Sequence, residues 1–184
     1  MMAAFHEEKK REVEALRNMM EAGKLPAPLP GPRPSFSAAL LAPHEGTLPV
    51  IAEYKRASPS RGDIRLDLLP EDIAARYARA GAACLSVLTE KAFFKGDMSF
   101  LARMAPAGLP LLRKDFILDP LQVRATAATP ASALLLIVRL TPDVRLLRDL
   151  REEAERFGME AVTEIFTEQD LNLARESGAR IIQV

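Results

Sequence analysis

The sequence predicts an α/β fold in which parallel strands alternate with helices. Short apolar runs begin after Pro49 and are separated by amphipathic segments up to the end of the chain. Nearly every position of a run is apolar, which is typical of strands buried on both faces of a parallel sheet. The runs start roughly 20 to 35 residues apart, one strand–helix unit each. This pattern fits a doubly wound sheet and a (β/α)8 TIM barrel equally well.

Composition narrows the class of protein and of partner. The chain has 184 residues, of which 48% are hydrophobic and 27% charged, as in an ordinary globular domain. Its 25 Lys and Arg balance 25 Asp and Glu. No global basic field therefore favours nucleic acid or an anionic membrane, and an anionic ligand must be held by local groups. The single cysteine, Cys84, excludes an internal disulfide. With neither a signal peptide nor an apolar span, the sequence predicts a soluble, cytoplasmic protein.

The N-terminal region, residues 1–48, is expected to precede the strand–helix units of residues 49–184. Apolar residues at helical spacing predict an amphipathic helix from about Phe5 to Glu21. Prolines recur through residues 24–34 and predict an extended connector, because proline fixes φ and removes a backbone donor. A short helical turn is expected at residues 36–41.

The strand–helix units follow in order. Strands are expected at residues 50–55, 84–89, 109–114, 133–138, 160–165 and 180–184. Helices are expected at residues 71–80, 121–128, 142–157 and 168–177. Three of these helices run into a glycine that suits a helix C-terminus, namely Gly81, Gly158 and Gly178. A whole barrel has eight strand–helix units and about 250 residues. With six expected strands, this chain is predicted to lack about two units.

Ionisable residues stand near the C-terminal ends of three of these strands. Glu53 and Lys55 are two residues apart and share a face of the first strand. Lys114 shares a face of the third strand with Leu112, and Glu164 shares a face of the fifth with Val162. Active sites of barrels lie at the C-terminal ends of the strands, so a shared site is predicted there. The alternatives are a solvent-facing ion pair at the first strand and a solvated Arg–Asp pair at the third.

Other candidate residues give weaker signals. Residues 58–62 (SPSRG) offer hydroxyls and a cation to an anion, although this is also an ordinary turn composition. Phe93, Phe94 and Phe116 suit either an aromatic substrate or the core. His6 and His44 lack the spacing of metal ligands and are expected at the surface, so no metal site is predicted. A dinucleotide fingerprint, a Walker loop and a nucleophile elbow are absent from the sequence.

Several segments of the chain together form a recognisable set of motifs. They are residues 51–62 (IAEYKRASPSRG), 85–90 (LSVLTE), 94–96 (FKG), 111–116 (LLRKDF) with Asp119, Pro120 and Gln122, and 133–137 (ALLLI). With these motifs the chain, from residue 36 onward, resembles indole-3-glycerol-phosphate synthase of tryptophan biosynthesis. It implies a TIM barrel that converts 1-(2-carboxyphenylamino)-1-deoxyribulose 5-phosphate to indole-3-glycerol phosphate. Carbon dioxide and water are lost, and no cofactor is required.

The resemblance also implies roles for individual residues. Lys114 would be the general acid that activates the ribulose carbonyl, and Glu164 the general base for dehydration. Lys55 would grip the substrate carboxylate or phosphate, while Glu53 orients the lysines. Substrate contacts are implied for Ser58, Phe94, Phe116 and Leu135.

The chain departs from the family pattern in several places. Gln183 stands where a glycine is usual, and residues 128–130 (ATP) replace an Ala-Gly turn. The family's catalytic Asn would follow Val184, and its last two strands are not present. The isolated chain is therefore expected to be inactive and to associate through exposed strand edges. The alternatives are a non-catalytic barrel fragment stabilised by association, or another phosphate-binding barrel such as phosphoribosylanthranilate isomerase. The latter lacks the Lys55 and Lys114 signatures.

Overall fold

The computed structural model describes residues 2–42 and 46–184, which form two compact units. The β1 unit comprises the described residues of Pro32–Asp115 and Thr129–Ala133. The β7 unit comprises the described residues of Met1–Gly31, Phe116–Ala128 and Leu134–Val184. Each unit contains strands backed by helices, and each has its own hydrophobic core.

The strand order identifies the type of α/β fold. The strands follow one another in the sheet as they do in the chain, in the order β1-β4-β5-β6-β7-β8. The pairs β1–β4, β4–β5 and β7–β8 are all parallel. A doubly wound sheet would reverse its strand order at a switch point, whereas a (β/α) barrel keeps chain order. The predicted incomplete (β/α)8 barrel is therefore confirmed.

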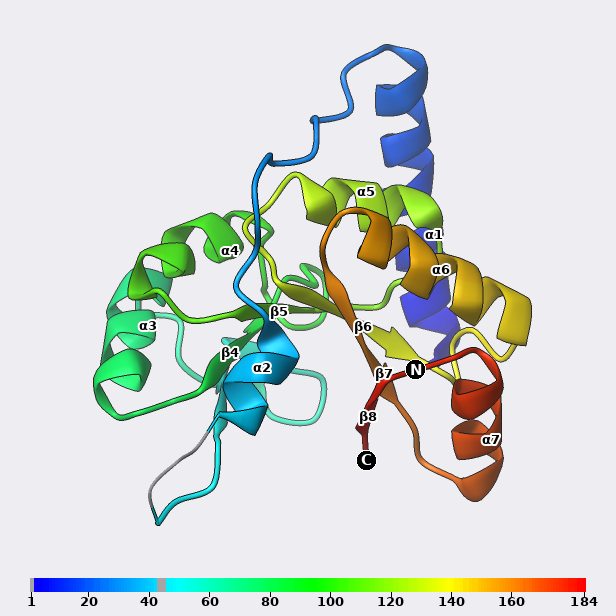
Figure 1. Ribbon diagram of the computed structural model, residues 1–184. Coiled ribbons are helices and arrows are strands. Elements are labelled where there is room, and N and C mark those ends of the chain that lie inside the picture. Colours follow the sequence, from blue (N-terminus) through cyan, green and yellow to red (C-terminus); the bar gives the residue numbers. More distant parts are fainter. Residues whose placement is uncertain (1, 43–45) are drawn as a thin grey trace. The chain divides into compact units, whose positions relative to one another are not determined.

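The β1 unit places two of its helices on the same side of its strands. Its strands are β1 (Ile51–Tyr54), β4 (Cys84–Leu88) and β5 (Leu111–Lys114), and a hairpin of β2 (Ala57–Ser58) and β3 (Gly62–Asp63) follows β1. Its helices are α2 (Phe36–Leu41), α3 (Pro70–Arg79), α4 (Ser99–Met104) and the 3-10 turn η1 (Ala105–Ala107). Figure 1 shows α3 and α4 on the same side of β4, where Leu85, Val87 and Leu111 pack against them.

Helix α2 packs against the beginning of β4 in the same unit. Phe36 is fully buried, and the thiol of Cys84 donates a weak hydrogen bond to the Phe36 carbonyl over 3.6 Å. Cys84 occupies the face of β4 that alternates with Leu85 and Val87, so it points away from α3 and α4. Helix α2 therefore covers the N-terminal end of the strand face that α3 and α4 leave open.

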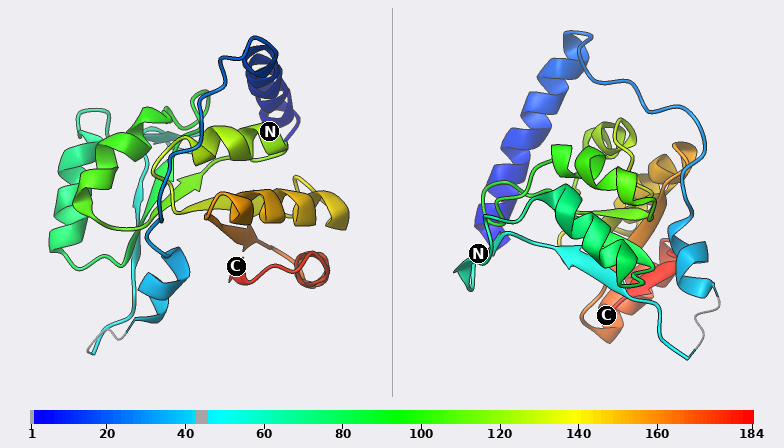
Figure 2. Two further views of the ribbon diagram at one scale, coloured as in Figure 1. Left: turned by 45° about the horizontal axis from the view of Figure 1, so that its top comes forward. Right: turned by 90° about the vertical axis from the view of Figure 1, so that its left-hand side faces the viewer.

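The β7 unit repeats the pattern of strands backed by helices. Its strands are β6 (Ala133–Ile137, from Leu134 onward), β7 (Glu160–Glu164) and β8 (Ile181–Gln183). Its helices are α1 (Met2–Glu21), α5 (Pro120–Ala127), α6 (Val144–Arg156) and α7 (Glu168–Glu176). Leu134, Leu136 and Ala161 pack against α5, α6 and α7. Figure 2 shows the long helix α1 beside α5.

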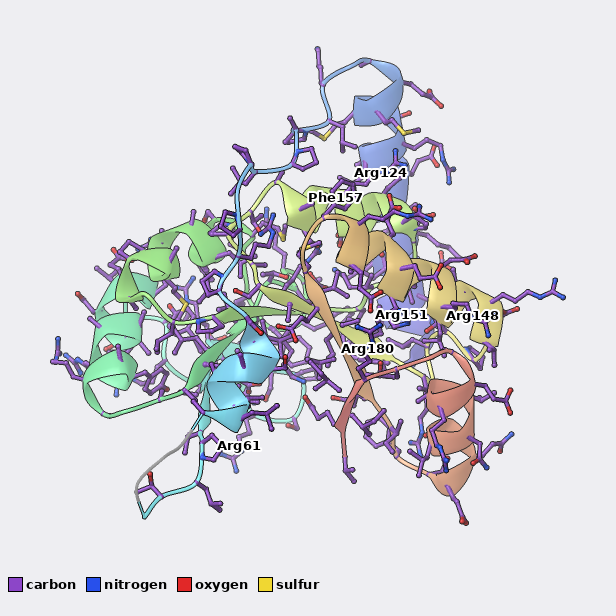
Figure 3. The ribbon with its side chains drawn as sticks, in the orientation of Figure 1. Arg61, Arg124, Arg148, Arg151, Phe157 and Arg180 are labelled. Atoms are coloured by element: carbon purple, nitrogen blue, oxygen red, sulfur yellow. The ribbon has the colours of Figure 1, made fainter. Side chains whose placement is uncertain are left out.

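Side chains from α6 fasten the end of α7. Arg148 donates a hydrogen bond to the Glu176 carbonyl (2.9 Å), and Arg151 donates one to the Ser177 carbonyl (3.2 Å). Figure 3 shows both arginines extending from α6. The last carbonyls of a helix have no hydrogen-bond donor within the helix, and the helix dipole places a partial negative charge there. The two guanidinium groups supply both the missing donors and the opposite charge.

The expected elements are present with small shifts at their ends. Gly81, Gly158 and Gly178 have φ values of 84°, 70° and 81°, the left-handed conformation that ends a helix. The hairpin of β2 and β3 and the short helix α4 were not among the expected elements. Among the described residues, no helix has the length and apolar character to cross a membrane.

Candidate functional site

The register of the β1 unit decides which side chains share a face. Glu53 lies beside Ser86 in the neighbouring strand, and Ser86 lies beside Leu112. Two residues further along, Leu88 lies beside Lys114. Leu85, Val87 and Leu111 pack on the helices. Successive side chains of a strand point to opposite faces, so the side chains of Glu53, Ser86, Leu88, Leu112 and Lys114 project from the face away from the helices. In a (β/α) barrel the face away from the helices is the interior.

Glu53 and Lys55 form an ion pair on this face. The Lys55 ammonium lies 2.8 Å from a carboxylate oxygen of Glu53, and both side chains are about one-third exposed, at 36% and 30%. Tyr77 of α3 donates a hydrogen bond to the Glu53 carbonyl over 3.1 Å and so fixes the strand behind the pair. The predicted sharing of a face is confirmed. A partly exposed pair of this kind contributes little to stability.

Lys114 is the last residue of β5 and is partly buried. Its carbonyl accepts a hydrogen bond from the Thr89 amide (3.2 Å), which ties the strand end to β4. Leu112, two residues earlier on the same face, is 2% exposed, and the neighbouring Leu88 is 4% exposed. The stem of Lys114 therefore leaves the C-terminal end of β5 beside two buried leucines.

The residues on either side of Lys114 form a buried network. Arg113 and Asp115 are paired at 2.8 Å, and both side chains are only 1% exposed. Thr89 joins them, since its hydroxyl donates to Asp115 (2.6 Å) and accepts from Arg113 (3.1 Å). The Arg–Asp pair of the alternative interpretation is therefore present, but it is buried and not solvated. Buried, mutually bonded neighbours restrict the backbone at Lys114, which preorganises its position.

A carboxylate shapes the loop between β4 and α4 that carries Phe94. Glu90 is 1% exposed and accepts hydrogen bonds from the amides of Ala92, Phe93 and Phe94 at 3.0, 2.7 and 3.1 Å. Phe94 itself is partly buried. Sequence reasoning did not single out Glu90, although its place directly after a buried strand was a usable signal.

Ser58 lies in the hairpin that follows β1. Its hydroxyl accepts a hydrogen bond from the Arg61 amide (3.3 Å), and Gly62 closes the turn with a φ of 63°. These contacts stabilise the hairpin itself. The predicted contact between Ser58 and a substrate stays a prediction.

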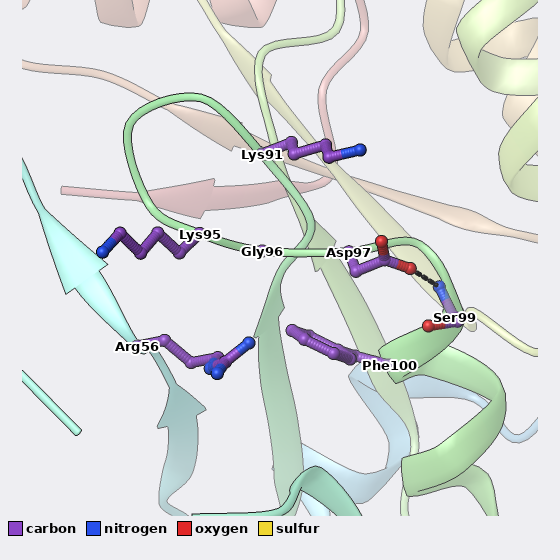
Figure 4. Close-up of a pocket in the computed structure, with 7 residues that line it drawn as sticks. All are labelled: Arg56, Lys91, Lys95, Gly96, Asp97, Ser99 and Phe100. Carbon is purple, nitrogen blue, oxygen red and sulfur yellow. Dashed lines mark hydrogen bonds between the residues drawn. The ribbon is translucent and has the colours of Figure 1, made fainter. Parts of the chain in front are cut away.

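A separate cleft of about 410 Å³ lies in the β1 unit. Figure 4 shows its lining residues, Arg56, Lys91, Lys95, Gly96, Asp97, Ser99 and Phe100. A hydrogen bond from Ser99 lowers the pKa of Asp97 below its usual 3.8, so this carboxylate offsets part of the positive charge. The guanidinium of Arg56 stacks over Phe100 on the helix-covered side, 5.7 Å from the ring centroid. Neither Lys55 nor Lys114 lines this cleft.

The remaining predicted residues belong to the β7 unit. Leu135 and Glu164 alternate with residues that pack on the helices, so both project from the face away from them. Gln183 lies beside Glu164 in β8, and its side-chain amide donates a hydrogen bond of 2.8 Å to the carboxylate. Phe116 stacks on Phe5 of α1 with ring centroids 4.4 Å apart.

The predicted residues thus fall into two groups. The β1 unit brings together Glu53, Lys55 and Lys114 on one strand face, with Ser58 and Phe94 in the adjoining loops. The β7 unit carries Glu164, Leu135 and Phe116. His6 is partly buried, and His44 lies outside the described residues.

Comparison with known proteins assigns the family. The family model for indole-3-glycerol phosphate synthase matches residues 2–184. The indole-3-glycerol phosphate synthase of Chlorobium phaeovibrioides is 42% identical over all of this chain and 71% of its own length. Those of Desulfosudis oleivorans and Desulfotalea psychrophila are 46% and 43% identical over 76% and 84% of this chain. The chain spans 53% and 59% of these two relatives. The chain therefore belongs to the indole-3-glycerol phosphate synthase family.

Proposed function

We propose that the full-length protein carrying this chain converts 1-(2-carboxyphenylamino)-1-deoxyribulose 5-phosphate to indole-3-glycerol phosphate. The observation that carries the proposal is the common strand face of Glu53, Lys55 and Lys114, two cations and one carboxylate at the strand ends where barrels have their sites. Family membership supports the same reaction. A small phosphorylated substrate suits such local cations, since the chain as a whole carries no net charge.

The chemistry divides into three bond changes. The ring carbon that bears the carboxylate attacks the ribulose carbonyl, and Lys114 donates a proton to the oxygen, which becomes more basic as the bond forms. The carbon–carbon bond to the carboxylate then breaks, carbon dioxide leaves, and its electron pair restores the aromatic ring. Finally the former carbonyl oxygen, now a hydroxyl, takes a second proton from Lys55 and leaves as water. The neighbouring carbon loses a proton to Glu164, and the double bond that completes the indole forms between the two carbons. The electrons come from the aromatic amine itself, so no redox cofactor is needed.

The other predicted residues complete the proposed site. Lys55 holds the substrate carboxylate or phosphate, and Glu53 keeps the Lys55 ammonium in place through their ion pair. Glu164 accepts the proton in the dehydration step, with Gln183 holding one of its oxygens. Ser58, Phe94, Phe116 and Leu135 contact the substrate.

The proposal is tested by following indole-3-glycerol phosphate formation through its fluorescence in the full-length protein. Lys114→Ala is expected to lower kcat at least about a hundredfold, the usual value of a general acid, while thermal unfolding stays near that of the parent. Lys10→Ala is the matched control, because Lys10 is exposed on α1 and pairs only with Glu7 among the described contacts. Full activity of Lys114→Ala would move the acid to another residue, and an inactive parent would end the proposal.

Localisation, organisation and partners follow from the same proposal. A small metabolite as substrate and a single, buried cysteine, Cys84, suit the cytoplasm. Residues 1–48 act as an N-terminal extension to a barrel that begins at residue 49. The 184 residues by themselves are proposed to be inactive and to self-associate through β1 and β8, the strands at the two ends of the sheet order.

A further inference from the structure

The hydroxyl of Ser86 is buried without a hydrogen-bond partner. Ser86 is 4% exposed, and its Oγ is one of two buried side-chain polar atoms that lack a partner among the described residues; the other is Nε of Arg56. Arg56 still donates through another nitrogen to the Leu66 carbonyl (2.9 Å), whereas Ser86 has only its one hydroxyl. Burying a hydroxyl unpaired is unfavourable, and such groups are rare in proteins.

Five other buried hydroxyls among the described residues have partners within the chain. Partners are recorded for Thr89, Thr126, Ser132, Thr141 and Ser177. The interior of a strand offers Ser86 no backbone acceptor, because its neighbours in the sheet use theirs in the ladder. An alanine would fill the same place without the cost. The exception at Ser86 therefore points to a partner that is supplied from outside the chain.

The position of Ser86 indicates which partner that is. Ser86 lies between Glu53 and Leu112, on the face that carries Lys55 and Lys114. Lys114 stands two residues beyond the level of Ser86, about 7 Å along the strand direction. A molecule held by Lys114 thus reaches the Ser86 hydroxyl with an atom that lies deeper on this face.

We infer that Ser86 is a substrate-contacting residue whose hydroxyl donates a hydrogen bond to a ribulose oxygen, next to the one that Lys114 protonates. The inference rests on the proposed function and adds a residue to that site. The aromatic part of the substrate offers no neutral oxygen, and its carboxylate is matched by Lys55. The sugar chain carries the hydroxyl and carbonyl oxygens that suit a single neutral donor.

The experiment compares two buried serines of the β1 unit in the full-length protein. Ser86→Ala is expected to lower kcat/KM about tenfold, the loss of one hydrogen bond, and to leave the melting temperature unchanged or slightly higher. Ser132→Ala is the control, because the Ser132 hydroxyl already accepts from the Leu111 amide (3.4 Å). That variant is expected to lose stability and to keep the parent kcat/KM.

Each outcome decides the inference. If Ser86→Ala turns over like an active parent, Ser86 does not touch the substrate, and the proposed function stands without it. If Ser86→Ala melts at a lower temperature in the way Ser132→Ala does, the hydroxyl has an internal partner and the inference is wrong. An inactive parent protein would remove the proposed function and this inference together.

Discussion

Lys114 owes its position to the two residues that flank it. Arg113 and Asp115 point to the helix-covered side of β5 and bond to each other and to Thr89, while Lys114 points the other way. A lysine stem is flexible by nature, so a fixed strand end beneath it limits where its ammonium travels. At the scale of single residues, the positioning of the proposed acid is thus carried out by side chains that never meet the substrate.

Breaking the buried pair is expected to cost stability. Asp115→Ala leaves the Arg113 guanidinium, whose side chain is 1% exposed, without its carboxylate. Removal of one partner of a buried pair typically destabilises a protein by about 3 to 5 kcal/mol. Urea unfolding of the full-length protein measures this loss. The double variant Arg113→Met, Asp115→Leu is expected to recover part of it, because no charge is left buried alone; equal losses in both variants would contradict the explanation.

At the scale of elements, the loop between β4 and α4 passes very close to the backbone at the end of β4. A Cβ on Gly96 would lie 2.4 Å from the Leu88 carbonyl oxygen and 2.7 Å from the Thr89 carbonyl carbon. Both are backbone atoms of the strand end, so the loop rather than the strand must move. Because Glu90 binds the amides of the same loop, a shift at Gly96 also displaces Phe94.

Gly96→Ala is therefore expected to affect stability and substrate affinity together. Overpacking of this kind costs about 1 to 3 kcal/mol, and a displaced Phe94 is expected to raise KM. Gly23→Ala serves as the control: its φ of 65° makes the alanine strained, but no atom lies within 4 Å of the added Cβ. Calorimetry measures the loss of stability and steady-state kinetics measures KM. An unchanged KM would show that Phe94 does not contact the substrate.

The stability that Asp170 gives to the start of α7 is expected to depend on pH. Hydrogen bonds from the Phe166 amide and from Thr167 lower the pKa of Asp170 below its usual 3.8. A carboxylate with a lowered pKa in the folded state stabilises it above the ordinary pKa, and the contribution disappears as pH falls through the lowered value. Asp170→Ala should therefore be less stable than the parent at pH 6, and this difference in stability should narrow as the pH falls below 3.8, the usual pKa of the group. Denaturant titrations across this range measure it; a constant gap would assign the loss to another cause.

On the level of the whole molecule, periodicity located the strands and the longer helices correctly. Each apolar run of five or six residues is long enough to reveal burial on both faces. The hairpin of β2 and β3 has only two residues per strand, and α4 has six residues, so neither repeats often enough to give a period. These elements could not be read from the pattern.

The site was only partly predictable for a related reason. Glu53, Lys55, Lys114 and Glu164 interrupt apolar runs and are conspicuous in the sequence. Arg113 looked like a surface residue, because charged side chains are seldom fully buried. Its partner Thr89 is 24 residues away in the chain, and that pairing exists only once β4 and β5 are adjacent. Ser86 was invisible for the same reason, since a small residue in a strand signals nothing until its neighbours are known.

The sheet order leads to an expectation for the 184 residues expressed alone. Ile51 of β1 and Ile182 of β8 are 39% and 36% exposed, at the two ends of that order. Exposed apolar strand edges invite pairing with other copies. Size-exclusion chromatography with light scattering is expected to show species larger than one chain, growing with concentration. Ile182→Lys should reduce this association. A monomer at every concentration would contradict self-association through the strand edges.

The contact between α2 and β4 provides a natural reporter. Cys84 is the only cysteine in the sequence, is fully buried, and meets the Phe36 carbonyl of α2. A thiol reagent is expected to reach it when α2 moves away from the strand, so the labelling rate of the unmodified protein reports how often this contact opens. If the substrate binds to the strand face that carries Cys84, the labelling rate of Cys84 should fall as substrate is added.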